Sequence, residues 1–351
     1  MSRTAAPDRG RVVCQDPQVG LAPLFRLYNK ARPRLDIRYE PAEARVSLHF
    51  RGPEALGVKE QTLMFVLLEL AQEHHRSGLG SWLDKDTPSA EAKALWDGLY
   101  QHSRGELPNT IWFSTSWYEL ARRMGKTLGG TMSGQLKKQL KRLCECVVWE
   151  RHKEDTGVFE LQSSLVAMVY NNDQQLFVAL NVRLAEAIIE PPYMPVSLAE
   201  RQLLELPAAK AAHAFLSTWI RYGHSNRIGK NTLIERLWPA EYDAKGKLKP
   251  PPGGTQRRRR KDLKEALNEV DGLPGWAVSG MDDEVLTIRR AKAPDETKNG
   301  MTGQATHRRR RTSPRASHVA ARDTSFCERA NPSPTTAEPG FQAIDASALF
   351  A

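Results

Sequence analysis

The stretch 253–290 concentrates side chains that can bind phosphate groups or read bases. Its first part contains the run Arg257-Arg-Arg-Arg-Lys261. Guanidinium and ammonium groups bind phosphates, and an arginine can also pair bidentately with guanine. An isolated basic run is equally typical of a solvated charge cluster. The elements that carry this run therefore decide between the two interpretations.

The residues after Thr255 predict an amphipathic helix. Thr255 is a good N-cap, and Leu263, Ala266, Leu267 and Val270 recur at helical spacing. At about 100° per residue, the side chains opposite this stripe are those of Arg257, Arg258, Lys261, Lys264 and Asn268. Arg259 and Arg260 lie nearer the inward side, so we expect them to reach flanking phosphates. A basic first half opposes the helix dipole, which indicates an external polyanion.

A predicted β-hairpin follows this helix. The runs 276–279 and 285–288 are short and apolar, and the turn sequence Gly280-Met-Asp-Asp283 joins them. A basic helix followed by a hairpin is typical of the second half of a winged helix, whose wing would offer Arg289 or Arg290 to nucleic acid.

The same plan occurs earlier in the chain. Ser116 and Glu119 form a capping box for a short helix that ends at Gly125, and a second helix is predicted over 132–146. Leu136, Leu140 and Leu143 would face inward. Candidate DNA contacts on this helix are Gln135, Lys138 and Arg142 facing outward, with Lys137 and Lys141 on the flanks. The runs 147–151 and 158–161 would form its wing.

These patterns predict an α+β protein with two tandem winged-helix domains. The predicted parts are a flexible N-terminal arm (1–33), a first winged-helix domain (34–191, with an insertion at 76–109), a second (192–290), and a disordered basic tail (291–351). Further expected elements are strands at 35–39, 46–50, 110–113, 165–170 and 176–181, and helices at 58–75, 89–100, 182–189, 198–206, 207–222 and 228–239.

Composition narrows the function classes. The 351 residues carry a formal net charge of +10, which favours a polyanionic partner. Four scattered cysteines lack zinc spacing, and the adjacent His74-His75 pair points in diverging directions on a helix, which indicates exposed helix-end residues rather than a metal site. No apolar run approaches the roughly 18 residues of a membrane span. We expect a cytoplasmic protein without metal or cofactor. The absence of a complete Walker A, relaxase or zinc motif argues against an enzyme.

Several segments resemble the replication protein C (RepC) initiators of IncQ-type plasmids and, more distantly, other iteron-binding initiators with two winged helices. The segments are Gly20–Arg26, Arg34–Tyr39, Gly52–Gly57, Leu176–Asn181, Leu237–Pro239, Arg257–Lys261, Glu265–Leu267 and Gly275–Val278. They span residues 20–290 in the order of the family. The insertion at 76–109 and the tail depart from it.

The resemblance implies binding to directly repeated iterons in duplex plasmid origin DNA. It further implies opening of an adjacent A·T-rich segment, on which a plasmid-encoded helicase and primase load. Whether the chain acts as a monomer or a homodimer stays open, as does the iteron sequence. A winged-helix transcriptional repressor without origin-melting activity is the alternative that the residues alone leave open, and a protein-interaction module with incidental basic charge is a third interpretation.

Overall fold

The computed structural model of the chain describes most of residues 11–292. The segments outside the description are 1–10, 29–31, 42–44, 79–80, 102–106, 155–156, 172–174, 191–192, 240, 243–247, 250–251 and 293–351. The tail predicted to be disordered, with Cys327 in it, therefore lies outside the described residues except for Ala291 and Lys292.

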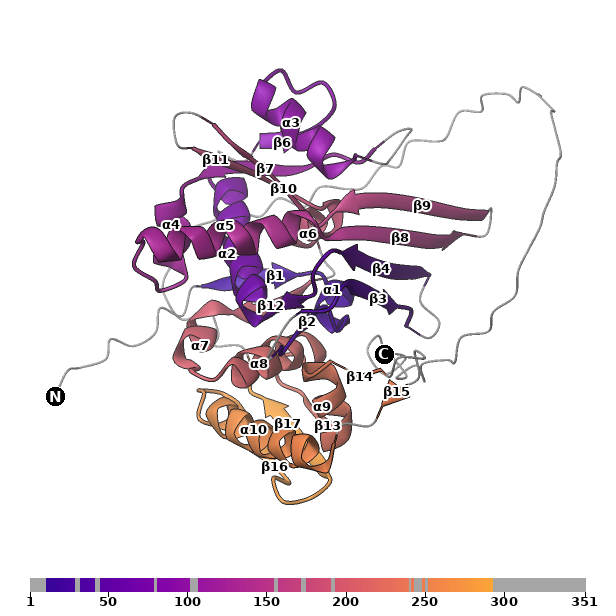
Figure 1. Cartoon of the computed structure of the whole chain (residues 1–351), viewed down its shortest axis with the longest axis vertical. Coiled ribbons are helices and arrows are strands. Elements are labelled where there is room, and N and C mark those ends of the chain that lie inside the picture. Colours follow the sequence, from indigo (N-terminus) through magenta and orange to yellow (C-terminus); the bar gives the residue numbers. More distant parts are fainter. Residues whose placement is uncertain are drawn as a thin grey trace, which may run out of the picture. The chain divides into compact units, whose positions relative to one another are not determined.

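Helices and mainly antiparallel strands are mixed along the described chain (Figure 1). The helices are α1 (Pro17–Leu21), α2 (Val58–Arg76), α3 (Ala90–Leu99), α4 (Trp117–Arg123), α5 (Gly130–Cys144), α6 (Val182–Ile189), α7 (Leu198–Leu203), α8 (Pro207–Trp219), α9 (Lys230–Leu237) and α10 (Gly253–Asp271). No helix of the described part is both long and apolar enough to cross a membrane.

The strands form several separate sheets. They are β1 (Val12–Gln15), β2 (Phe25–Arg26), β3 (Leu35–Tyr39), β4 (Val46–Gly52), β5 (Leu56–Gly57), β6 (Ser81–Leu83), β7 (Thr110–Thr115), β8 (Val147–Glu154), β9 (Gly157–Ser164), β10 (Val166–Tyr170), β11 (Leu176–Leu180), β12 (Met194–Ser197), β13 (Ser225–Gly229), β14 (Glu241–Tyr242), β15 (Leu248–Lys249), β16 (Trp276–Ser279) and β17 (Val285–Arg290). The two four-stranded sheets have the orders β3-β4-β8-β9 and β10-β11-β7-β6.

Helix α2 is the central element of the first core. The apolar run 63–68 predicted a buried helix here, and all six side chains are at most 2% exposed. Figure 1 shows α2 and α5 in the region between the strands β7 and β1. The helix packs against α5, β1 and β7, so the basic helix of the first half rests directly on this core.

The predicted wing of the first half is part of a larger sheet. Strands β8 and β9 pair antiparallel, with Trp149 opposite Gln162. However, β8 also pairs with β4 along its other edge, with His49 opposite Trp149, and β4 pairs with β3. The two hairpins expected to be separate thus join into one four-stranded sheet, because both edges of β8 find a partner.

The second core contains α8, α9, α10 and the three-stranded sheet β13-β17-β16. Strand β13 was not predicted, because its sequence Ser-Asn-Arg-Ile-Gly buries only Ile228. Its backbone pairs with β17, with Ile228 opposite Leu286. Helix α9 therefore begins at Lys230, two residues after its predicted start at Ile228.

The prediction of a flexible N-terminal arm over 1–33 is wrong for the described residues 11–28, which contain β1, α1 and β2. Strand β1 pairs antiparallel with β12, with Val13 opposite Val196. Arg11 forms an ion pair with Glu69 on α2 at 2.6 Å. Four residues of strand are too short a run to show a period-2 pattern, so this pairing between segments far apart in sequence gave no signal.

The insertion at 76–109 contributes to the fold around it. Helix α3 begins after Ser89, whose hydroxyl accepts a hydrogen bond from the amide of Ala92 at 2.9 Å, close to the predicted boundary. Strand β6 extends the sheet through β7, with Trp82 opposite Ile111. A small third core forms where α3 packs against β10 and β11.

Candidate nucleic-acid interface

Helix α10 carries the basic run and buries its opposite face. Its N-cap is Pro252, so the predicted cap, Thr255, lies inside the first turn instead. The predicted stripe of Leu263, Ala266, Leu267 and Val270 is buried. This stripe packs mainly against α8 and β16, and the helix ends before Gly272. Burial of the stripe fixes the rotation of the helix about its axis.

The cations predicted to point outward from α10 are exposed. Arg258 and Lys261 have 75% of their side-chain surface exposed, and their carboxylate partners, Asp262 and Glu265, lie one turn on at 3.9 Å and 3.8 Å. Arg257 is exposed and has no ion pair among the described residues. Exposed pairs of this kind contribute about 0–1 kcal/mol. A phosphate can therefore replace either carboxylate at small cost.

Two of the remaining cations of α10, Lys264 and Arg260, pair with carboxylates in the hairpin that follows it. Lys264 pairs with Asp282 in the turn between β16 and β17 at 2.8 Å, which holds the pKa of that carboxyl below its usual range. Arg260 pairs with Glu284 at 3.5 Å. Arg259 is half-buried and donates to the carbonyl oxygen of Pro239 at 3.4 Å. Arg259 thus lies nearer the inward side, as predicted, whereas Arg260 is exposed. Contact of either side chain with flanking phosphates stays a prediction.

Only one of the two candidate wing arginines faces the solvent. Arg289 is exposed, whereas Arg290 is 1% exposed, so a DNA contact by Arg290 is wrong. The Arg290 guanidinium donates to the carbonyl oxygens of Ser217 and Pro195, both at 3.0 Å. It also lies 3.8 Å from the ring centre of Tyr222. Arg290 therefore belongs to the core of the second half.

Helix α5 presents a polar face of similar design. Leu136, Leu140 and Leu143 are buried, as predicted. Gln135, Lys137, Lys138 and Lys141 are exposed, and only Lys141 pairs with a carboxylate among the described residues, that of Glu145 at 3.5 Å. The ammonium of Lys137 lies 5.8 Å from the ring centre of Trp117 and 5.7 Å from that of Tyr170. Two rings thus restrict where Lys137 points.

Arg142 is the exception on α5. Its guanidinium pairs with Glu54 and, at 3.2 Å, with Glu60, whose carboxylate is fully buried. Glu60 also pairs with Arg32 at 2.8 Å. A buried carboxylate is stable only when cations or hydrogen bonds satisfy it. The prediction that Arg142 contacts DNA is therefore wrong, since this side chain turns towards the carboxylates beside α2.

Comparison with known proteins decides the family. A sequence model of the family described as Replication protein C (RepC) matches residues 11–292. The chain belongs to the RepC family. No curated protein matches it.

Three solved structures show similarity to this RepC-family chain. The SeMet derivative of domains 2 and 3 of RctB has 10% identity and a TM-score of 0.47, covering 78% of this chain and 98% of that one. A second crystal structure, of RctB domains 2-3 (RctB-155-483), has 10% identity and a TM-score of 0.44, covering 79% of this chain and 97% of that one. The crystal structure of the Pi initiator protein in complex with iteron DNA has 14% identity and a TM-score of 0.41, covering 68% of this chain and 92% of that one.

The aromatic setting of Lys137 in this RepC-family protein was missed in the sequence. Tyr170 ends β10, which lies far from α5 along the chain, and no local pattern connects the two. Tyr118, one residue into α4, is 64% exposed. Its outward position follows from the helical phase of Trp117 and Leu120, which are buried, and could have been read from the sequence.

His74 and His75 lie in the last turn of α2 in this RepC-family protein, but they are not exposed as predicted. Both side chains are half-buried, with the ring of His74 against Phe113 and that of His75 edge-on to Trp82. Burial lowers the pKa of His74, an effect that the nearby Glu73 carboxylate opposes. Among the residues that the structure describes, no cluster of three or more His, Cys, Asp or Glu side chains could hold a metal ion. Cys14, Cys144 and Cys146 are free thiols.

The pairing of Arg142 predicts a change in stability rather than in DNA binding. Arg142→Gln should lower the free energy of unfolding by about 1–2 kcal/mol, because Glu60 keeps Arg32 but loses its second cation. Urea denaturation measures the loss, and a mobility shift measures affinity for duplex DNA. Lys138→Gln, on the exposed face of α5, is the matched control. A variant at 142 with full stability and reduced DNA affinity would contradict this assignment.

Proposed function

We propose that this protein is a plasmid replication initiator that binds directly repeated iterons in duplex origin DNA. The observation that carries the proposal is α10, where a buried stripe holds Arg257, Arg258 and Lys261 outward on an exposed face. Exposed cations in a helical array match phosphates along a groove, and arginine can read guanine at the groove edge. Membership of the RepC family supports the assignment to replication.

The local architecture around both basic helices supports a tandem winged-helix arrangement. In the second half, α9 precedes α10, and the antiparallel pair β16 and β17 follows it. In the first half, α4 and α5 occupy the corresponding places before the pair β8 and β9. We assign α10 and α5 as the recognition helices, with Gln135, Lys137, Lys138 and Lys141 as contacts from α5. Arg289 would contact DNA from the wing of the second half.

The initiator role includes local opening of an A·T-rich segment beside the iterons, followed by loading of the plasmid-encoded helicase and primase. This part rests on the family resemblance. Binding of several copies to adjacent iterons would bend the origin and store elastic energy in it. The role requires binding and deformation of DNA, and the protein itself should not cleave supercoiled origin DNA in a nicking assay.

A mobility shift with repeat-containing origin DNA tests the proposal. Binding should be tighter to iterons than to a scrambled duplex of equal length, by a factor on the order of 10³ or more, at each of two salt concentrations. Adding the protein to supercoiled origin plasmid should make thymines in the A·T-rich segment reactive to permanganate. Specific binding without reactive thymines would identify a repressor. Equal binding to both duplexes would overturn the proposal.

A further inference from the structure

The sheet β3-β4-β8-β9 has one buried and one solvent-facing side. Phe50, Leu48 and Val148 project from the buried side, where they join the first core. Since successive residues of a strand alternate between faces, the register places the neighbouring side chains on the opposite side. This outer face comprises Arg34, Asp36, Arg38, Ser47, His49, Arg51, Val147, Trp149, Arg151, Lys153, Glu160 and Gln162.

Cations outnumber carboxylates on this outer face. Its described side chains include five arginines or lysines and two carboxylates, a net charge of +3. Asp36 is bound to His49, and Glu160 pairs with Arg151 at 3.3 Å. In the described part of the chain, no ion pair involves the remaining four cations, which are Arg34, Arg38, Arg51 and Lys153.

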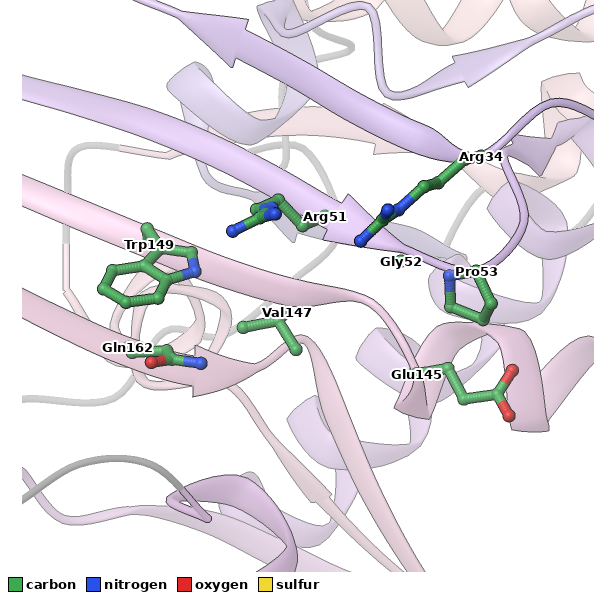
Figure 2. A pocket seen from close by; sticks show the side chains of 8 residues that line it. All are labelled: Arg34, Arg51, Gly52, Pro53, Glu145, Val147, Trp149 and Gln162. Atoms are coloured by element: carbon green, nitrogen blue, oxygen red, sulfur yellow. The ribbon is translucent and has the colours of Figure 1, made fainter. Parts of the chain in front are cut away.

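A groove on this outer face includes two of its cations, Arg34 and Arg51. It is lined by Arg34 before β3, Arg51 at the end of β4 and Val147, Trp149 and Gln162 from β8 and β9 (Figure 2). Figure 2 shows the two arginine side chains over the strands on one side of Val147, with the indole of Trp149 farther along β8. Arg34 and Arg51 thus lie beside an aromatic ring, and the one carboxylate in the groove lining is that of Glu145. Asp36, which lies opposite Arg51 on the same face, is bound to His49.

The ring of Trp149 distinguishes this groove from a merely solvated charge cluster. Trp149 is half-buried although it lies on the outer side, and its cross-strand neighbour is His49. Rings on a sheet face can stack on nucleic-acid bases, and a four-stranded sheet can hold two or three bases in this way. In a duplex, the faces of each base are covered by the neighbouring bases. Only an unpaired strand can therefore stack a base on the Trp149 ring while its phosphates contact the cations.

We propose that the outer face of the β3-β4-β8-β9 sheet binds single-stranded DNA, with Trp149 stacking on a base and Arg34, Arg38 and Arg51 contacting phosphates. DNA rather than RNA is the ligand because the inference rests on the proposed function, in which opening of the origin produces unpaired DNA. The groove begins at Glu145, directly after α5, so one of the proposed duplex-binding helices leads into it. The sheet would hold one separated strand and oppose its reannealing.

Fluorescence anisotropy of the full chain with labelled oligothymidylate tests the proposal, with labelled origin duplex measured in parallel. The double variant Arg38→Gln/Arg51→Gln should lower affinity for the oligonucleotide roughly tenfold or more at moderate salt. Trp149→Leu should lower it roughly tenfold and Trp149→Phe much less, because phenylalanine keeps a stacking ring. None of these variants should change affinity for the duplex. The matched control Lys85→Gln/Lys93→Gln, which removes two exposed cations of the insertion, should leave both affinities unchanged.

The outcomes separate this proposal from the proposed function. Unchanged oligothymidylate binding by the folded sheet variants, with melting temperatures equal to that of the unmodified chain, overturns the inference while leaving duplex binding intact. Equal loss of binding to both DNA forms in those variants also overturns it, since a single shared site would then serve both. Tighter binding to oligouridylate overturns the assignment to DNA. Conversely, a chain that binds oligothymidylate through the sheet but does not discriminate iterons supports the inference and overturns the proposed function.

Discussion

Replacing Arg257, Arg258 and Lys261 together by glutamine is expected to lower affinity for the iteron duplex roughly hundredfold at physiological salt. Each lost phosphate contact retains a counterion on the DNA, so the slope of log K against log salt should become less steep by about 2.7. Titration by fluorescence anisotropy at several salt concentrations measures both quantities. Stability should stay close to that of the unmodified chain, because all three side chains are exposed.

A matched triple variant controls for net charge. Lys59→Gln, Lys85→Gln and Lys93→Gln remove the same number of exposed cations from α2 and from the insertion. This control should retain the affinity and nearly the salt slope of the unmodified chain. If both triple variants lose affinity equally, long-range attraction rather than contact through α10 governs binding, and the proposed interface is wrong.

The ion pairs on α10 do not remove its capacity to bind phosphates. Arg258 and Lys261 lie one turn from their carboxylates at separations near the upper limit for an ion pair. Such exposed pairs are weak, and a phosphate that approaches from outside the helix can form a bidentate pair with the Arg258 guanidinium in place of the carboxylate. Arg142 differs because one of its partners, Glu60, is fully buried and would be left with a single cation.

Local patterns predicted most of the helices and strands. The stripes of α5 and α10 and the strands β3, β4, β10 and β11 were found because each is amphipathic or apolar over several residues. Pairing between distant segments was not found. Strand β1 and the joining of β8 to β4 depend on which backbone edges meet in space, and no local period encodes that choice.

The candidate site was predictable where helical phase alone decides exposure. Arg257, Arg258 and Lys261 followed from the positions of Leu263 and Leu267 on α10. Arg142 did not, because a long side chain can turn towards carboxylates that come from another part of the chain. The burial of Arg290 could have been predicted from the sequence. Every second residue of a strand points to the same face, so Arg290 shares a face with Leu286 and Ile288, which are apolar.

Arg290→Ala is expected to destabilise the protein by about 3–5 kcal/mol. The substitution leaves the carbonyl oxygens of Ser217, Ile220 and Pro195 without this donor and removes the guanidinium between the rings of Tyr222 and Trp276. Burial lowers the pKa of Arg290, and the nearby Tyr222 and Glu200 oppose this effect. The buried cation is held by hydrogen bonds that alanine cannot form. Urea denaturation followed by circular dichroism measures the loss.

The neighbouring residue supplies the sharpest control for that experiment. Arg289→Ala removes an identical side chain one position earlier on the exposed face of β17, so its stability should change by less than about 0.5 kcal/mol. Its affinity for the iteron duplex should fall several-fold through the loss of one phosphate contact. Equal stability of the two variants would mean that Arg290 is not held in the core. In that case the alternation of exposed and buried side chains along β17, from which Arg289 is proposed as the wing contact, would also be wrong.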